Sequence, residues 1–176
     1  MDLVQRLTRV RDHLLGAIEG LDETTLTTEP VLTAWTIKDI VGHVVSWGDE
    51  FRSDVRTILE GTHPGYDHLI STEDDFSEWN GRQIAQKRDW RWPCLREDLD
   101  RDYQETVELI GRLQSKDFRQ RGVTPWKPAA TQRPDVLTRR DTESVERLIK
   151  YHVGHIAVHA RALEKWRGQR MARSTP

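Results

Sequence analysis

The hydrophobic positions along the chain repeat every three or four residues, which is the spacing of one face of an α-helix. This pattern predicts long helices over about residues 2–20, 37–60 and 142–168. Residues 74–115 carry the same pattern, but Pro93 interrupts it, because its ring removes a backbone donor and crowds the preceding turn. We therefore expect either one kinked helix or two helices in series in that segment.

The ends of the second predicted helix carry clear signals. Thr36 and Asp39 form a Thr-x-x-Asp sequence of the capping-box type, in which the hydroxyl accepts from a free amide and the carboxylate reaches back to another. Gly61 follows the last apolar positions, where glycine accepts the left-handed backbone that ends many helices. The predicted helix therefore has a defined start and a defined end.

Four long amphipathic segments predict an all-α protein, an antiparallel four-helix bundle that forms a single domain over residues 1–168. The long connection 116–140 indicates a crossover before the last helix. Within it, residues 121–140 hold five basic residues against one acid, and we assign them no role. Residues 169–176 form a basic tail that we expect to fray.

Composition and charge narrow the function classes. The 176 residues include 27 Lys and Arg against 29 Asp and Glu, so the net charge is −2, which argues against a nucleic-acid partner. Mean hydropathy is −0.73, and no stretch has the length and apolarity of a membrane span, so we expect no membrane partner. Cys94 is the single cysteine, and the charged start of the chain does not resemble a signal peptide. These features together predict a cytoplasmic protein.

The seven histidines carry most of the candidate chemistry. His155 and His159 lie one helical turn apart, the spacing at which a helix offers two imidazoles to one metal ion. His43 lies at the edge of the apolar face of the second predicted helix. Two histidines from one helix and one from another make a three-nitrogen site with an open position, which is typical of catalytic zinc, although imidazole also suits nickel, copper and iron. The alternative is that all three are ordinary core histidines.

Other residues are candidates for a substrate pocket. His152 shares the face of the last predicted helix, but it lies too far from His159 for the two to bind one ion. Trp47 comes one turn after the histidine of the second helix and can form a pocket wall. Trp79 and Asn80 stand near the start of the third helix, where they can border the same cavity. No catalytic acid or base is identifiable.

Two motifs give the sequence a family resemblance. The run from Trp35 to Trp47, WTIKDIVGHVVSW, resembles the second-helix signature of the DinB/YfiT-like superfamily, in the form that its ClbS/DfsB branch has. The later His155-x-x-x-His159, followed by Trp166, resembles the last helix of the same family. The resemblance runs in order along almost the whole chain, and the segment 75–80 is similar to the start of the family's third helix.

This resemblance implies a DinB-type four-helix bundle, often a homodimer, with a divalent metal ion held by three histidines. Those histidines correspond here to His43, His155 and His159. We expect zinc or nickel, and for some activities a low-molecular-weight thiol. The leading hypothesis is a metal-assisted hydrolase or thiol-dependent transferase that acts on a small electrophilic molecule. The alternatives are a metal-independent protein that sequesters a small molecule, as in ClbS/DfsB-like self-resistance, and a structural homodimer without chemistry.

Overall fold

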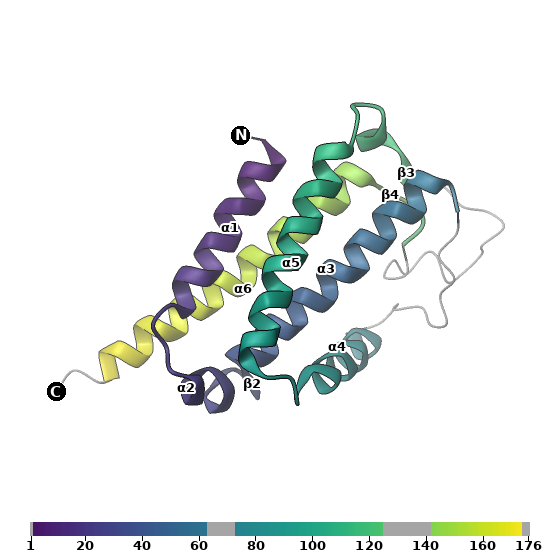
Figure 1. The fold of residues 1–176 in the computed structure, drawn as a ribbon. Coiled ribbons are helices and arrows are strands. Elements are labelled where there is room, and N and C mark those ends of the chain that lie inside the picture. Colours follow the sequence, from purple (N-terminus) through teal and green to yellow (C-terminus); the bar gives the residue numbers. More distant parts are fainter. Residues whose placement is uncertain (1, 63–72, 125–141, 174–176) are drawn as a thin grey trace.

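The computed structural model describes residues 2–62, 73–124 and 142–173 (Figure 1). In this part of the chain the α-helices are α1 Leu3–Ile18, α2 Glu23–Thr28, α3 Ile37–Glu60, α4 Glu73–Lys87, α5 Trp92–Arg112 and α6 Val145–Arg173. Short antiparallel strand pairs are also present. Strand β1 Pro30–Leu32 pairs with β2 Trp35–Thr36, and β3 Arg121–Gly122 pairs with β4 Glu143–Ser144. A 3-10 turn, η1, spans Asp117–Arg119.

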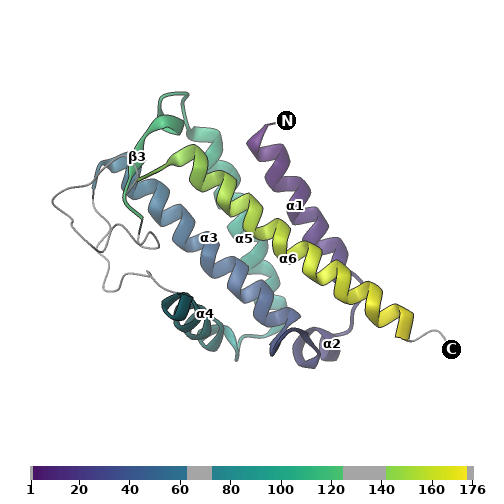
Figure 2. The same ribbon diagram turned by 180° about the vertical axis from the view of Figure 1, so that it is seen from behind.

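Four long helices form a bundle around one hydrophobic core, which confirms the predicted fold class (Figures 1 and 2). Helix α1 packs along α6, and α3 packs against both α5 and α6. The shorter α4 lies against α3. The apolar faces that the sequence pattern marked point into this core, and its largest fully buried side chains include Leu7, Leu14, Ile37, Ile40, Leu95, Leu148, Ile149 and Leu163.

The connection that crosses the bundle is not where the sequence placed it. Helices α1 and α6 run in one direction along the bundle, whereas α3 and α5 run in the other (Figures 1 and 2). The chain therefore returns along the bundle between α3 and α5, and α6 begins close to where α5 ends. Pro93 lies in the first turn of α5, where proline is tolerated, so it begins a new helix rather than bending an existing one, which agrees with the second of the two sequence alternatives.

The predicted caps of α3 are both present. The Thr36 hydroxyl accepts from the Asp39 amide at 3.1 Å, and the Asp39 carboxylate accepts from the Thr36 amide at 2.9 Å. Gly61 ends the helix with a φ of 66°, and its amide donates to the carbonyl of Ile58. Because these caps fix where α3 begins, they also fix His43 two turns into the helix.

Helix α6 runs further than expected. It continues to Arg173, past the predicted end at residue 168, so residues 169–173 are helical rather than frayed. Arg170 explains the extension, because its guanidinium donates to the Glu29 carboxylate at 2.9 and 3.0 Å and so ties the last turns to the body. The last tail residues, 174–176, and most of the basic connection lie outside the described residues. No helix in the described part of the chain is long and apolar enough to cross a membrane.

Candidate functional site

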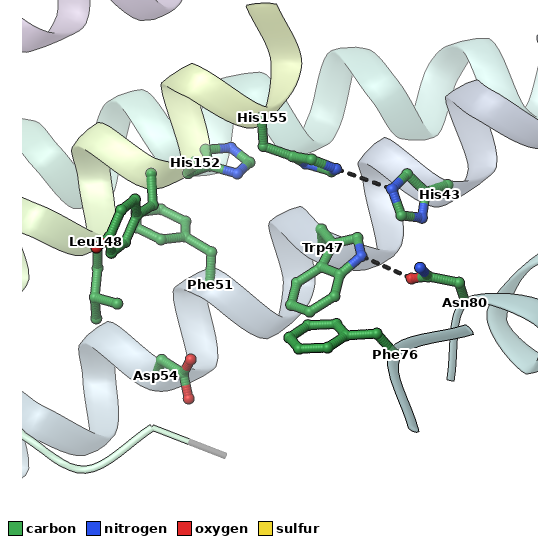
Figure 3. Close-up of a pocket in the computed structure, with 10 residues that line it drawn as sticks. His43, Trp47, Phe51, Asp54, Phe76, Asn80, Leu148, His152 and His155 are labelled. Atoms are coloured by element: carbon green, nitrogen blue, oxygen red, sulfur yellow. Dashed lines mark hydrogen bonds between the residues drawn. The ribbon is translucent and has the colours of Figure 1, made fainter. Parts of the chain in front are cut away.

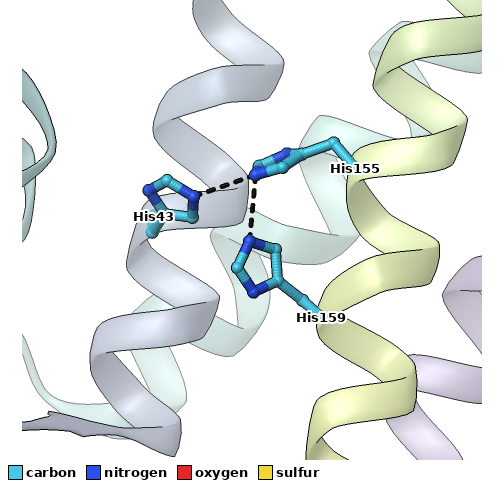
Figure 4. A group of neighbouring side chains, drawn as sticks. All are labelled: His43, His155 and His159. Carbon is cyan, nitrogen blue, oxygen red and sulfur yellow. Dashed lines mark hydrogen bonds between the residues drawn. The ribbon is translucent and has the colours of Figure 1, made fainter. Parts of the chain in front are cut away.

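Three histidines from two helices meet inside the bundle (Figure 4). His43 projects from α3, and His155 and His159 project from α6. The Nε2 atom of His155 lies 2.9 Å from the Nε2 atom of His43 and 2.9 Å from that of His159. The three ring centroids are 4.6 to 4.9 Å apart. The three histidines that the sequence indicated as candidate metal ligands therefore have converging ring nitrogens.

Hydrogen bonding alone does not satisfy this arrangement. A neutral imidazole nitrogen either donates one proton or accepts in the plane of its ring, so the His155 Nε2 can form one well-directed hydrogen bond but faces two neighbours. A divalent cation that accepts a lone pair from each ring resolves the conflict. Three imidazole nitrogens are the ligand set of catalytic zinc sites, with a fourth position open, and they also suit nickel. The donor set therefore fits a metal ion.

The rings are held mainly by packing. The Nδ1 atoms of His43 and His159 are buried, and neither has a hydrogen-bond partner among the described residues. In most metal sites this second nitrogen donates to a carboxylate, a carbonyl or water. Here the ring centroids of Trp35 and His43 lie 4.9 Å apart. The ring centroids of Trp47 and His43 lie 6.3 Å apart, in an edge-to-face contact. Aromatic contacts thus orient this ligand ring where the usual hydrogen bond is missing.

Burial keeps the imidazoles neutral. It lowers the pKa of His43 to about 3 and that of His155 to about 2, with a further contribution from the neighbouring histidines. Burial also lowers the pKa of His159 to about 4. At neutral pH all three rings therefore have a free lone pair, which is the form that binds a metal ion.

A cavity of about 340 Å³ adjoins the histidines (Figure 3). His43 and His155 belong to both the cluster and the cavity wall, so a ligand in the cavity reaches the cluster directly. The lining is mostly aromatic and apolar, as is usual for small-molecule sites. It consists of His43, Trp47, Phe51, Asp54, Phe76, Asn80, Leu148, Tyr151, His152 and His155.

The predicted pocket residues of α3 and α4 take different roles. Trp47 lines the cavity and stacks with Phe76 at a centroid distance of 5.9 Å. Asn80 lines it too, but its side-chain carbonyl accepts the Trp47 indole N–H at 3.0 Å, so the amide orients the wall (Figure 3). Trp79 is not among the lining residues, which corrects the expectation that it borders the cavity. It is only 5% exposed and packs against Trp47 at 4.4 Å, because its position on α4 turns it toward the protein interior.

His152 lines the cavity without joining the cluster, as its spacing predicted. Its ring stacks on Phe51 with centroids 4.5 Å apart and planes 2° apart. Burial, with a smaller contribution from the Arg52 guanidinium, lowers its pKa to about 3. This fourth histidine is therefore also neutral at physiological pH.

Sequence reasoning missed part of the lining. Phe51, Asp54 and Leu148 line the cavity, but on the sequence they belong to helix faces that pack into the core. A signal did exist, because Phe51 lies eight residues after His43, and Leu148 lies seven residues before His155, on the same helical faces. Two turns from each histidine, the apolar face borders a cavity rather than packed side chains.

Several solved structures have a similar fold. The colibactin self-resistance protein ClbS aligns with a TM-score of 0.70 at 14% identity, over 93% of this chain and 92% of that one. The sibling lethal factor precursor DfsB aligns with a TM-score of 0.71 at 17% identity, over 96% and 94%. YfiT from Bacillus subtilis, described as a probable metal-dependent hydrolase with an unusual four-helix bundle topology, aligns with a TM-score of 0.67 at 15% identity, over 97% and 86%. Comparison with curated protein sequences found no match.

One of these structures bears on nucleic-acid binding. ClbS was crystallised in complex with double-stranded DNA, which contradicts the expectation of no nucleic-acid partner for this kind of protein. That expectation relied on the net charge of −2. Net charge is a poor criterion here, because it averages over the whole surface, whereas phosphate contacts depend on where the basic side chains lie.

The family itself is established by sequence. A family model described as the DinB superfamily matches residues 6–163, which include most of α1, all of α3 and the three converging histidines. The match covers most of the chain, and the similar folds of ClbS, DfsB and YfiT agree with it. The resemblance first seen in two short motifs is thereby confirmed, and the chain belongs to the DinB superfamily.

Proposed function

We propose that the protein binds a divalent metal ion, zinc or nickel, through His43, His155 and His159 and acts on a small molecule in the adjoining cavity. The observation that carries this proposal is the convergence of three Nε2 atoms at the wall of an aromatic cavity. YfiT, which has a similar fold, is described as a probable metal-dependent hydrolase. We infer either a hydrolase or a thiol-dependent transferase acting on an electrophilic compound.

The chain's own residues supply binding and positioning. If His43, His155 and His159 held a divalent ion, it would supply a water or thiol of lowered pKa and so a nucleophile near neutral pH. Trp47 and Phe76 offer a flat apolar surface that holds a substrate beside the cluster and excludes water. Asp54 and Tyr151 also line the cavity, where a carboxylate can accept a proton and a phenol can donate one during hydrolysis.

Metal analysis of the purified protein tests the site. After loading with zinc or nickel and desalting, we expect one ion per chain in the wild type and almost none in His43→Ala or His159→Ala. His13→Ala is the matched control, because His13 is exposed on α1, pairs with Glu164 at 3.0 Å and lies outside the cluster. Equal metal content in the wild type and the two cluster variants would refute the proposal.

A turnover assay then tests the chemistry. The metal-loaded protein is offered a panel of electrophilic small molecules with and without a low-molecular-weight thiol. We expect catalytic turnover that stops on chelation and returns when the metal is restored. Turnover that is unaffected by chelation and by His43→Ala would place the chemistry elsewhere.

The aromatic cavity also supports a second candidate function, which is sequestration of a small molecule without metal. Trp47, Phe51 and Phe76 provide apolar contact area for a ligand, and ClbS is described as a self-resistance protein. Stoichiometric protection that persists after chelation would favour this function over catalysis. Because ClbS was seen with DNA, an anisotropy titration with a labelled duplex measures whether this chain shares that partner.

A further inference from the structure

The cavity contains one buried polar group that the proposed metal site does not use. His152 is 5% exposed, and its Nε2 atom is buried with no hydrogen-bond partner among the described residues. It lies one turn before His155 on the same helix, yet it contributes no atom to the metal-ligand group. Figure 3 shows its ring beside the cavity, between Leu148 and His155.

The plane of the His152 ring is fixed, but the position of its nitrogens within that plane is not. The ring lies parallel to Phe51, with a 2° angle between the planes, and Phe51 is itself buried. Rotation by half a turn about χ2 exchanges ring nitrogens and carbons while it keeps the same plane, and this torsion is roughly two-fold. The edge of the imidazole can therefore present a nitrogen to the cavity without losing the stacking contact.

An imidazole at this position destabilises the fold relative to an apolar side chain. Leaving a buried polar atom without a partner destabilises the fold, whereas phenylalanine or leucine would fill the same space without that cost. Burial and the nearby Arg52 keep the ring neutral by lowering its pKa, so it has one donor and one acceptor. A buried group of this kind calls for a partner, and the adjoining cavity is where a ligand can supply one.

We propose that His152 is a specificity-determining residue, which hydrogen-bonds to a hydroxyl or carbonyl group of a neutral, flat, aromatic or conjugated ligand. The ligand's flat body would lie against Trp47 and Phe76, which stack at an angle of 26°. The ligand is neutral because a mostly apolar lining penalises a net charge. This inference deepens the proposed function by naming the ligand class, and it does not require the metal.

Two probes of similar size separate the hydrogen bond from apolar contact. We would measure the dissociation constants of 2-naphthol and 2-methylnaphthalene on metal-free protein by quenching of tryptophan fluorescence. The wild type should prefer the naphthol by about five- to tenfold, which is the usual contribution of one hydrogen bond. His152→Phe keeps an aromatic ring against Phe51 and should abolish the preference, and His152→Gln should restore part of it. His13→Phe, the same change at an exposed position, should leave the preference intact.

Two results would overturn the inference: equal affinity of the wild type for both probes, or an undiminished preference in His152→Phe. If that variant does not fold, nitrogen-15 spectra of the wild-type imidazoles provide the second measurement. The ring nitrogens of His152 should shift with 2-naphthol and not with 2-methylnaphthalene, and the absence of this difference would also overturn the inference. Because these measurements use metal-free protein, their failure is distinct from a failure of metal binding at His43.

Discussion

Helix α3 carries two buried polar clusters, and they differ in how their hydrogen bonds are satisfied. Arg52 is 3% exposed, and its guanidinium binds the Asp102 carboxylate, the Asp102 carbonyl at 3.1 Å and the Thr106 hydroxyl at 3.1 Å. It also donates to Asp49 at 2.6 Å. The cluster around His43, nine residues earlier, consists of like groups that face one another and leave buried nitrogens unpaired.

The comparison separates a structural cluster from a binding cluster. The donors of Arg52 are matched by acceptors, most of them on α5, so this cluster joins two helices and needs nothing further. The histidine cluster consists of like ring nitrogens that face one another, and within the described part of the chain no cation shares their lone pairs, so a bound ion of the kind we propose would complete it. Buried polar residues therefore point to function where the chain leaves them unmatched, not simply where they are buried.

Lowering the pH should have the largest effect on stability, because the buried histidines are the residues whose protonation differs most between the folded and unfolded chain. The pKa values of His43, His152, His155 and His159 are lowered in the folded protein to between about 2 and about 4, against 6.5 as the ordinary value. The unfolded chain therefore binds more protons, and stability present above pH 6.5 is lost as the pH falls. Each histidine contributes up to about 1.4 kcal/mol per pH unit. Urea unfolding of metal-free protein between pH 7.5 and 5 measures this loss.

The control for the acid experiment removes one titrating group. His152→Phe should reduce the slope by the contribution of one histidine. Asp102 on the paired side has the opposite sign, because burial raises its pKa to about 6 from an ordinary 3.8, so its contribution to stability grows as the pH falls through 6. A stability that does not change between pH 7.5 and 5 would contradict the assignment of four neutral buried histidines.

Breaking the paired cluster should cost the next largest amount. Arg52→Leu leaves the Asp102 carboxylate buried without its cation, and we expect the free energy of unfolding to fall by about 3–5 kcal/mol, measured in urea at pH 7.5. Metal content should stay at the wild-type value. The double variant Arg52→Leu/Asp102→Leu should recover much of the loss, since neither charge remains. A loss of metal binding in Arg52→Leu would show that the two clusters are not independent.

Completing the unmatched cluster should stabilise the fold by a smaller amount. Zinc at about one hundred times its dissociation constant should add about 2.7 kcal/mol to the free energy of unfolding, because the ion binds the folded chain. Thermal unfolding with and without the ion measures the gain, and His43→Ala should show none. An equal gain in that variant would place the stabilising ion outside the cluster.

The wall of the cavity should give the smallest effect. Asn80→Ala removes the acceptor of the Trp47 indole N–H, and we expect a stability loss of about 1 kcal/mol together with weaker binding of 2-naphthol. Glu78→Ala on the same helix is the control, because its contact with Arg82 at 3.6 Å is exposed and should contribute little. If Asn80→Ala bound the probe as well as Glu78→Ala does, the amide would not position the wall.

The histidines could be predicted from sequence because their signal is local. His155 and His159 are one turn apart on one helix, and the caps at Thr36 and Gly61 fix the helix that carries His43. The residues that line the cavity were harder to identify. An apolar side chain such as Phe51 gives the same sequence pattern whether it packs against another protein side chain or lines an empty space.

The arrangement of helices was predicted less completely than their positions. Each helix follows from its own apolar pattern, but the direction in which α5 runs depends on how the chain crosses from α3, which no local pattern encodes. The pairing of Arg52 with Asp102 follows from that direction, since it joins residues 50 positions apart on two parallel helices. The role of Trp79 depended in the same way on the packing of α4 against α3.

The cluster also joins distant parts of the chain. His43 and His155 are 112 positions apart in sequence, yet their nitrogens are 2.9 Å apart across the contact between α3 and α6. An ion held there would act as a removable cross-link that closes a loop of more than half the chain, and the closure entropy of so long a loop is substantial. The concentration of free metal would then determine how strongly α3 and α6 are held together. The same ion would therefore contribute both to reactivity and to the stability of the fold.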